Sequence, residues 1–176
     1  MNYDGLHLDA AAVTVLALVT AQRLGELVYA RFNERRLKNA GAVEHGASHY
    51  PLIVALHAAW LAGLWFLASG IRPDYGWLSI FVLLQAARIW VLHTLGPRWT
   101  TRIIVPPDKS PIRTGPYRFL SHPNYAVVAA EIFVLPMAFG LFFYALLFSA
   151  LNALVLAIRI RAEDTALRGS GVPSHS

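Results

Sequence analysis

One segment, R-T-G-P-Y-R-F-L-S-H-P-N-Y from Arg113 to Tyr125, carries the side chains best suited to bind a charged small molecule. Its prolines and its glycine preclude a regular helix. The segment nevertheless lies between two long apolar stretches. Irregular backbone in such a place must lie at a membrane surface or line a cavity, because unpaired backbone groups are costly in lipid. The segment is therefore either a basic interfacial loop that binds anionic lipid or a ligand-binding loop that leads into a helix.

The sequences G-P-Y-R and S-H-P-N-Y resemble the cofactor motif of the isoprenylcysteine carboxyl methyltransferase family, which comprises integral-membrane enzymes that use S-adenosylmethionine. A second segment, R-I-R-A-E-D-T-A-L from Arg159 to Leu167, resembles the family's R-I-x-x-E-E-x-x-L, with Asp164 in place of the second Glu. Membrane sterol and steroid reductases carry a similar His-Pro-x-Tyr segment. The pair of motifs, separated by one apolar stretch, is therefore more specific than the first motif alone.

The resemblance implies S-adenosylmethionine as the cofactor and suggests how each motif would bind it. An acidic pair would bind the ribose diol or the ammonium group, and Arg118 or Arg113 would pair with the carboxylate. His122 and Tyr125 would hold the adenosyl or carboxylate end. The cofactor-binding residues that the resemblance implies are Gly115, Tyr117, Arg118, His122, Pro123, Asn124, Tyr125, Glu163 and Asp164.

The methyl acceptor would need an oxygen nucleophile held in line with the methyl group, in a site that excludes water. Arg159 or Arg161 would steer a carboxylate, whereas a phenol or enol would also need a base, for which Glu131 or Glu163 is available. Arg88 and Asn152 are the candidates for acceptor binding.

Segments of the N-terminal two-thirds, among them R-L-G-E-L, resemble the bacterial branch of the family. Some members of that branch methylate alkylpyrones or alkylresorcinols, which favours a lipophilic hydroxyl acceptor over a prenylcysteine carboxylate. We expect a tunnel lined by residues such as Phe133, Phe142 and Leu154 to hold the acceptor's chain.

The composition is that of an integral membrane protein with one domain over residues 1–176. Hydrophobic residues make up 56% and charged residues 14%, against a usual charged share of about 25%. The absence of cysteine excludes thiolate nucleophiles and cysteine metal sites, and no metal site is expected. The basic residues lie in short loops between apolar stretches, so membrane topology explains the net charge of +5 better than nucleic-acid binding.

Apolar stretches predict an all-α fold with about five transmembrane helices. The first three run from Ala10 to Tyr29, from Leu52 to Ser69 and from Trp77 to Leu95. The last stretch, Tyr125 to Ile160, is too long for one crossing and should form a hairpin that turns near Pro136 and Gly140.

The loop charges predict an orientation. Lys and Arg are concentrated in the first and third loops, which places the N-terminus outside and both motifs at the cytoplasmic side of a bacterial inner membrane. Ionisable residues within the spans, including Arg23, Glu26, Arg88 and Glu131, then share one depth. They form either a polar vestibule or buried pairs such as Arg23 with Glu26.

Two other functions remain open from the sequence. An NADPH-dependent membrane reductase would account for His-Pro-Asn-Tyr alone, but the Glu163-Asp164 pair disfavours a pocket for the 2′-phosphate. A non-enzymatic membrane subunit or transporter would have no need of both motifs.

Overall fold

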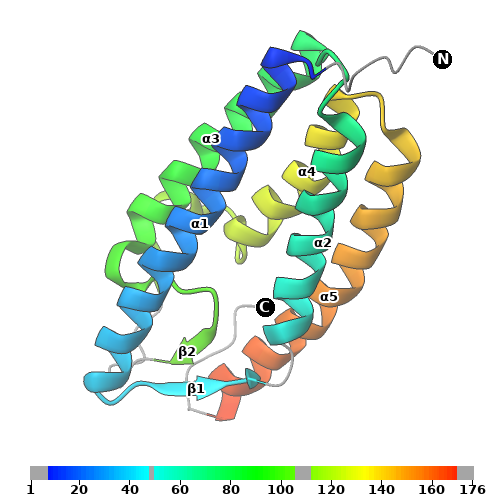
Figure 1. The fold of residues 1–176 in the computed structure, drawn as a ribbon. Helices are drawn as coiled ribbons and strands as arrows, with labels where there is room; N and C mark the ends of the chain where they lie inside the picture. The colour runs from blue at the N-terminus through cyan, green and yellow to red at the C-terminus, as the bar shows by residue number, and fades with distance from the viewer. Residues whose placement is uncertain (1–7, 48–49, 106–111, 170–176) are drawn as a thin grey trace, which may run out of the picture.

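The structure, a computed structural model, describes residues 8–47, 50–105 and 112–169, except for the side chains of 164 and 166–169. In this part of the chain, five α-helices pack as an up-and-down bundle (Figure 1). They are α1 (Ala10–Asn39), α2 (Tyr50–Ala68), α3 (Tyr75–Leu95), α4 (Pro123–Ala138) and α5 (Phe142–Gly169). The predicted all-α class is confirmed, with the addition of two short strands.

Helix α1 continues ten residues beyond the predicted end at Tyr29. The basic segment that follows Tyr29 ends the apolar stretch but does not end the helix. Lys38 donates a hydrogen bond to Glu34, one turn away, at 2.8 Å. Basic side chains in the last turn also stabilise the helix by interacting with its dipole. At the other end, the Asp9 side chain caps the helix by accepting from the Ala12 N–H at 2.9 Å.

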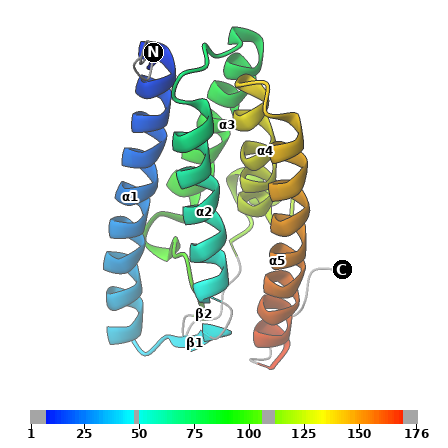
Figure 2. The same cartoon turned by 45° about the vertical axis from the view of Figure 1, so that its right-hand side comes forward.

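Four helices of the described chain are long and apolar enough to cross a membrane, and the chain is an integral membrane protein. The exception is α4, whose 16 residues span about 24 Å at ~1.5 Å per residue. Figure 2 shows α4 confined to the half of the bundle nearer the start of α1. The predicted hairpin is confirmed: the chain turns between α4 and α5 at Gly140, where φ is 69° and a residue without Cβ is favoured. Because α4 is short, its N-terminal end lies within the bundle and stops short of the ends of its longer neighbours (Figure 2).

Two three-residue strands join the long connections at the end of the bundle opposite the N-terminus. Strand β1 (Val43–His45) pairs antiparallel with β2 (Ile103–Val105), with Glu44 opposite Ile104. A hydrogen bond from Lys38, together with one from Arg102, holds the pKa of the Glu44 carboxyl below its usual value. The ribbon thereby ties the connection after α1 to the connection after α3.

The apolar core runs through the middle of the bundle and includes Leu16, Leu64, Ile132 and Leu135. Helices α2 and α5 approach closely at Gly63. The Tyr144 hydroxyl donates to the Trp60 carbonyl at 2.7 Å, and a Cβ at Gly63 would lie 2.3 Å from that hydroxyl. The α2–α5 contact therefore needs glycine at this position.

Candidate functional site

The two sequence motifs meet where α4 begins beside the C-terminal half of α5. The Tyr125 hydroxyl donates to the Glu163 carboxylate and accepts from Nε of Arg159 at 2.8 Å. The His122 ring stacks on Tyr125, with centroids 5.3 Å apart and planes at 15°. The hairpin of α4 and α5 thus brings residues that are 38 positions apart into hydrogen-bonding contact.

A polar cavity of about 190 Å³ lies at this meeting point, bounded by the connection between α3 and α4 and by α5. Five of the predicted cofactor residues line it: Tyr117, His122, Asn124, Tyr125 and Glu163. Burial, with the charge of Glu163 as a second cause, raises the pKa of the Tyr117 hydroxyl, which stays protonated. Sequence-based prediction missed other lining residues, among them Arg98, Trp99, Thr100, Arg102 and Ser121.

Three of the remaining predicted cofactor residues, Gly115, Arg118 and Pro123, do not line the cavity. Gly115 has a φ of 56°, and a Cβ there would lie 2.4 Å from Oγ1 of Thr94, so it fixes the loop against α3. Pro123 is buried at the first position of α4. Arg118 is exposed, with its guanidinium carbon 5.8 Å from the centre of the Phe119 ring. The Asp164 side chain lies outside the described residues.

A second, larger cavity of about 280 Å³ lies between α1, α2, α4 and α5. Leu27, Leu61 and Leu156 are among its apolar walls. Leu24 and Val54, at its rim on α1 and α2, are 59% and 40% exposed on the outer surface of the bundle. The rim is therefore apolar where it faces the lipid side of two membrane-spanning helices.

This cavity is not where the sequence placed the acceptor tunnel. Phe133 packs edge-on against Trp77, and Phe142 and Leu154 are 46% and 65% exposed on the outside of the bundle. Hydropathy shows that these residues are apolar but not which way each faces, since that depends on how the helices pack.

The polar and the apolar cavities share one wall, formed by Trp99, Thr100, Asn124, Tyr125 and Arg159. Two buried atoms of this wall, Oδ1 of Asn124 and Nε1 of Trp99, have no hydrogen-bond partner among the described residues. Buried polar atoms are rarely left unpaired. The wall therefore holds one acceptor and one donor that a ligand can satisfy.

Helix α1 positions Trp99 in this wall. Nδ2 of the buried Asn33 donates to the Trp99 carbonyl at 2.9 Å, and the Tyr29 ring stacks on the Trp99 indole at 6.0 Å. The charged end of α1, which the sequence pattern indicated only as the end of a membrane span, is therefore a support for the site.

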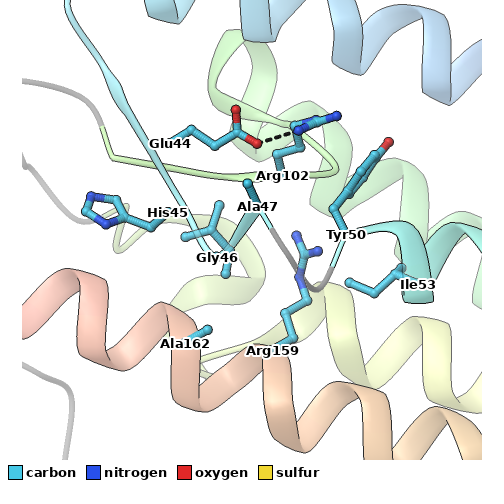
Figure 3. Close-up of a pocket in the computed structure, with 10 residues that line it drawn as sticks. Glu44, His45, Gly46, Ala47, Tyr50, Ile53, Arg102, Arg159 and Ala162 are labelled. Carbon is cyan, nitrogen blue, oxygen red and sulfur yellow. Dashed lines mark hydrogen bonds and ion pairs between the residues drawn. The ribbon is translucent and has the colours of Figure 1, made fainter.

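Arg159 occupies the centre of the site, whereas Arg161 does not. Arg159 lines both cavities and extends from α5 toward Tyr50 (Figure 3). The small space drawn in Figure 3 measures about 10 Å³ and has room for roughly one water molecule. Arg161, two positions later, is exposed and lines neither cavity.

Four charges, three of them buried and the fourth, Arg23, half-buried, form a closed network beside the apolar cavity. Arg88 bonds to Glu26 through Nε and Nη2 and to Glu131 at 3.0 Å. Arg23 bonds to Glu131 at 2.7 Å and to Glu26 at 3.3 Å. The predicted pairing of Arg23 with Glu26 is thus part of a larger, charge-balanced cluster from α1, α3 and α4.

This network alters the interpretation of three predicted site residues. Glu131 is 0% exposed, lines neither cavity and accepts from Arg23, Arg88 and Gln85. Because three donors bind its carboxylate and neither cavity reaches it, its placement does not support a role as a base. Arg88 lines the apolar cavity but its guanidinium is bound to carboxylates. Asn152 is buried and lines neither cavity.

Comparison with known proteins identifies the family. Residues 77–169 match the isoprenylcysteine carboxyl methyltransferase (ICMT) family. The chain belongs to this family. It is 40% identical over 159 residues to "Uncharacterized protein YpbQ" of Bacillus subtilis, an alignment that covers 88% of this chain and 95% of the relative. An uncharacterized Haemophilus influenzae protein is 25% identical over 158 residues, or 86% of this chain and 91% of that one. No solved structure matches.

The ICMT match covers every residue that lines the polar cavity, all of which lie between Leu95 and Glu163. The α1 and α2 walls of the apolar cavity precede the matched range. ICMT membership implies a methyltransferase, and members of the family in general use S-adenosylmethionine. The polar cavity therefore lies wholly within the part of the chain that matches the family.

Proposed function

We propose that this protein is a membrane-embedded O-methyltransferase that transfers a methyl group from S-adenosylmethionine to a lipophilic acceptor. The observation that carries the proposal is the wall shared by the polar and the apolar cavities. A water-soluble cofactor and a lipid-soluble acceptor differ in the surroundings they need, and their reacting atoms must still meet. Two cavities of opposite character that touch at Asn124, Tyr125 and Arg159 supply that arrangement.

The residues of the polar cavity fit the cofactor's groups. When bound, S-adenosylmethionine supplies an electrophilic methyl group on a sulfonium. Glu163 offers a carboxylate for the ammonium or the ribose hydroxyls, and the unpaired Oδ1 of Asn124 accepts a further hydrogen bond. Arg98 and Arg102 line the same cavity, and Arg102 there is already paired with Glu44 and Glu34. In this proposal Arg98 attracts the cofactor's carboxylate, a role that the sequence motifs suggested for Arg113 or Arg118.

The apolar cavity fits an acceptor with a long hydrocarbon chain, because each buried methylene group contributes ~0.8 kcal/mol. The proposed acceptor is an alkylpyrone- or alkylresorcinol-like hydroxyl, with an isoprenylcysteine carboxylate as the alternative. Arg159 borders both cavities and orients the oxygen nucleophile of either acceptor. Chain length should consequently govern KM more than kcat, since the chain is bound equally in the ground and transition states.

We further propose that the N-terminus lies outside and the polar cavity faces the cytoplasm, where the cofactor is made. The β1–β2 ribbon and the C-terminal part of α5 lie at the same end of the bundle, and the N-terminal end of α4 points toward that end (Figure 1). Reporter fusions after Pro73 and after Leu167 should report opposite sides of the membrane. A same-side result would contradict this topology.

Calorimetric titration of the purified, detergent-solubilised protein tests the cofactor assignment. Glu163→Ala and His122→Ala should each weaken S-adenosylmethionine binding roughly ten- to a hundred-fold, because a hydrogen bond to a charged group contributes ~1.5–3 kcal/mol. Arg161→Ala, a neighbouring change outside both cavities, should bind normally. Wild-type protein that binds NADPH and not S-adenosylmethionine would overturn the proposal in favour of a reductase.

A further inference from the structure

We propose that His57 is the general base for the acceptor, and that the acceptor is accordingly a phenolic hydroxyl on an alkyl chain. This inference rests on the proposed methyltransferase function and names the acceptor of that same site. His57 lies on α2, outside the region that matches the family, and it lines the apolar cavity.

The hydrogen bonding of His57 fixes which ring nitrogen is available. Nδ1 lies 2.8 Å from the Ile53 carbonyl oxygen. A carbonyl oxygen can only accept, so Nδ1 carries the hydrogen and the neutral ring keeps a lone pair on Nε2. Among the described residues, no partner bonds to Nε2. The Nε2 atom of His57 is therefore available to accept a hydrogen bond from a hydroxyl in the cavity.

The other candidate bases near the apolar cavity are already bound. Glu26 lines the cavity, but its oxygens accept from Gln22, Arg23 and Arg88. Glu131 is outside the cavity and equally bound, and Glu163 accepts from Tyr125 and lines the polar cavity alone. Among the described residues that line the apolar cavity, His57 is the one whose side chain offers an unbound nitrogen lone pair.

The chemistry explains why a base selects one acceptor class. A phenol resembles tyrosine, whose pKa is about 10, and is almost wholly protonated near neutral pH, whereas a carboxylic acid is already ionised. As the phenol oxygen bonds to the methyl group, its O–H bond breaks and the proton passes to Nε2. The cofactor's sulfur keeps the electron pair of the broken C–S bond, so one positive charge moves from sulfur to imidazole. A carboxylate acceptor needs no such step.

A spectroscopic test works without cofactor. A long-chain 4-alkyl-2-nitrophenol absorbs visible light as the phenolate and much less as the phenol. Burial in an apolar cavity alone raises a phenol's pKa and lowers the phenolate fraction. A base at hydrogen-bonding distance does the opposite. The wild-type complex should therefore show a larger phenolate fraction than the same probe in detergent micelles at equal pH, and a smaller fraction would overturn the proposal.

His57→Gln should abolish that excess of phenolate. His57→Asn, whose amide can also donate to the Ile53 carbonyl, is a second variant that should abolish it too. With an alkylresorcinol acceptor, kcat/KM should fall about 10²- to 10⁴-fold, which should exceed any fall in kcat/KM for farnesylcysteine, because a carboxylate needs no base. His93→Gln is the matched control, because His93 is exposed on α3 and lines neither cavity.

The pH dependence of kcat/KM separates a base from a merely structural histidine. In the wild type, kcat/KM for the phenol should rise with pH through the titration of one group, and in His57→Gln that rise should disappear.

The charged or titratable groups around His57 are Arg23 and Glu26 on α1, Arg88 on α3, Glu131 and Tyr125 on α4, Arg159 on α5 and Tyr50 on its own helix.

Each outcome decides between the two proposals. An unchanged phenolate spectrum and pH profile in folded His57→Gln would overturn the role of His57 while leaving the methyltransferase standing. Methylation of farnesylcysteine without any methylation of an alkylresorcinol would also overturn the proposed role of His57. Failure to bind S-adenosylmethionine would instead refute the proposed function, and the nitrophenol spectrum would still decide whether His57 accepts a proton in the cavity.

Discussion

Glu131→Gln should lower the melting temperature of the protein sharply, because it removes a fully buried charge from a network of four that balance one another. Oε2 of Glu131 lies 2.7 Å from Nη2 of Arg23 and 3.0 Å from Nη1 of Arg88. After the substitution, Glu26 alone would face both guanidinium groups. Gln has nearly the same size as Glu, so the loss of charge is the main change.

The expected size follows from this geometry. Removing one partner of a buried ion pair costs about 3–5 kcal/mol. For a protein of this length each kcal/mol shifts the melting temperature by about 2–4 °C, so a decrease of roughly 6–20 °C is expected. Glu34→Gln breaks pairs at the exposed end of the bundle and should cost about 1 kcal/mol or less.

Thermal unfolding in detergent, followed by circular dichroism, measures both variants. The double variant Arg23→Gln with Glu131→Gln restores the charge balance and keeps the two-point bond between Arg88 and Glu26, so it should recover most of the lost stability. If Glu131→Gln melts like the wild type but abolishes methyl transfer, Glu131 is a catalytic base and its role in the buried charge network is refuted.

Three further changes give distinct results. Gly115→Ala should lower the melting temperature and the cofactor affinity, because φ is 56° and the new Cβ would meet Oγ1 of Thr94 at 2.4 Å; adding Thr94→Ala should recover the part due to the clash, and full stability of the single variant would contradict this. Tyr125→Phe removes the hydroxyl that joins the two motifs and should weaken cofactor binding about ten-fold, so an unchanged calorimetric affinity would count against the motif geometry. The lowered pKa of Glu44, due first to its hydrogen bond from Lys38, means that its stabilisation is present above the unfolded pKa of about 4.3 and is lost as the pH falls through the lower folded pKa. The protection of β1 amides, measured relative to their intrinsic exchange rates, should therefore fall in acid, and this pH dependence should disappear in Glu44→Gln.

Hydropathy was enough to predict the helices, because membrane crossings demand long apolar stretches. The turn at Gly140 followed from a stretch too long for one span, and the meeting of Tyr125 with Glu163 followed from that turn. The two strands could not be found, since three residues carry too little pattern. The helical continuation beyond Tyr29 was missed because a charged segment ends a membrane span without ending a helix.

The composition of the site was harder to predict than its location. Arg159 and Arg161 are alike in sequence, and only the packing of α5 shows that Arg159 borders both cavities. Trp99 belongs to no sequence motif. Its position in the wall between the cavities depends on a hydrogen bond from Asn33, 66 positions earlier, to its carbonyl oxygen. From the sequence alone Glu131 was a candidate base, because its hydrogen-bond partners lie on other helices and the sequence does not show that they meet. In each case, contacts between distant segments decide the role.

The most direct test of the central claim is transfer of a labelled methyl group from S-adenosylmethionine to a lipid-soluble acceptor by the purified protein in detergent. We expect label in the organic extract as the methyl ether of an alkylresorcinol or the methyl ester of farnesylcysteine, and little label with Glu163→Ala. No transfer to either acceptor by folded wild-type protein, with oxidation of NADPH in its place, would contradict the account.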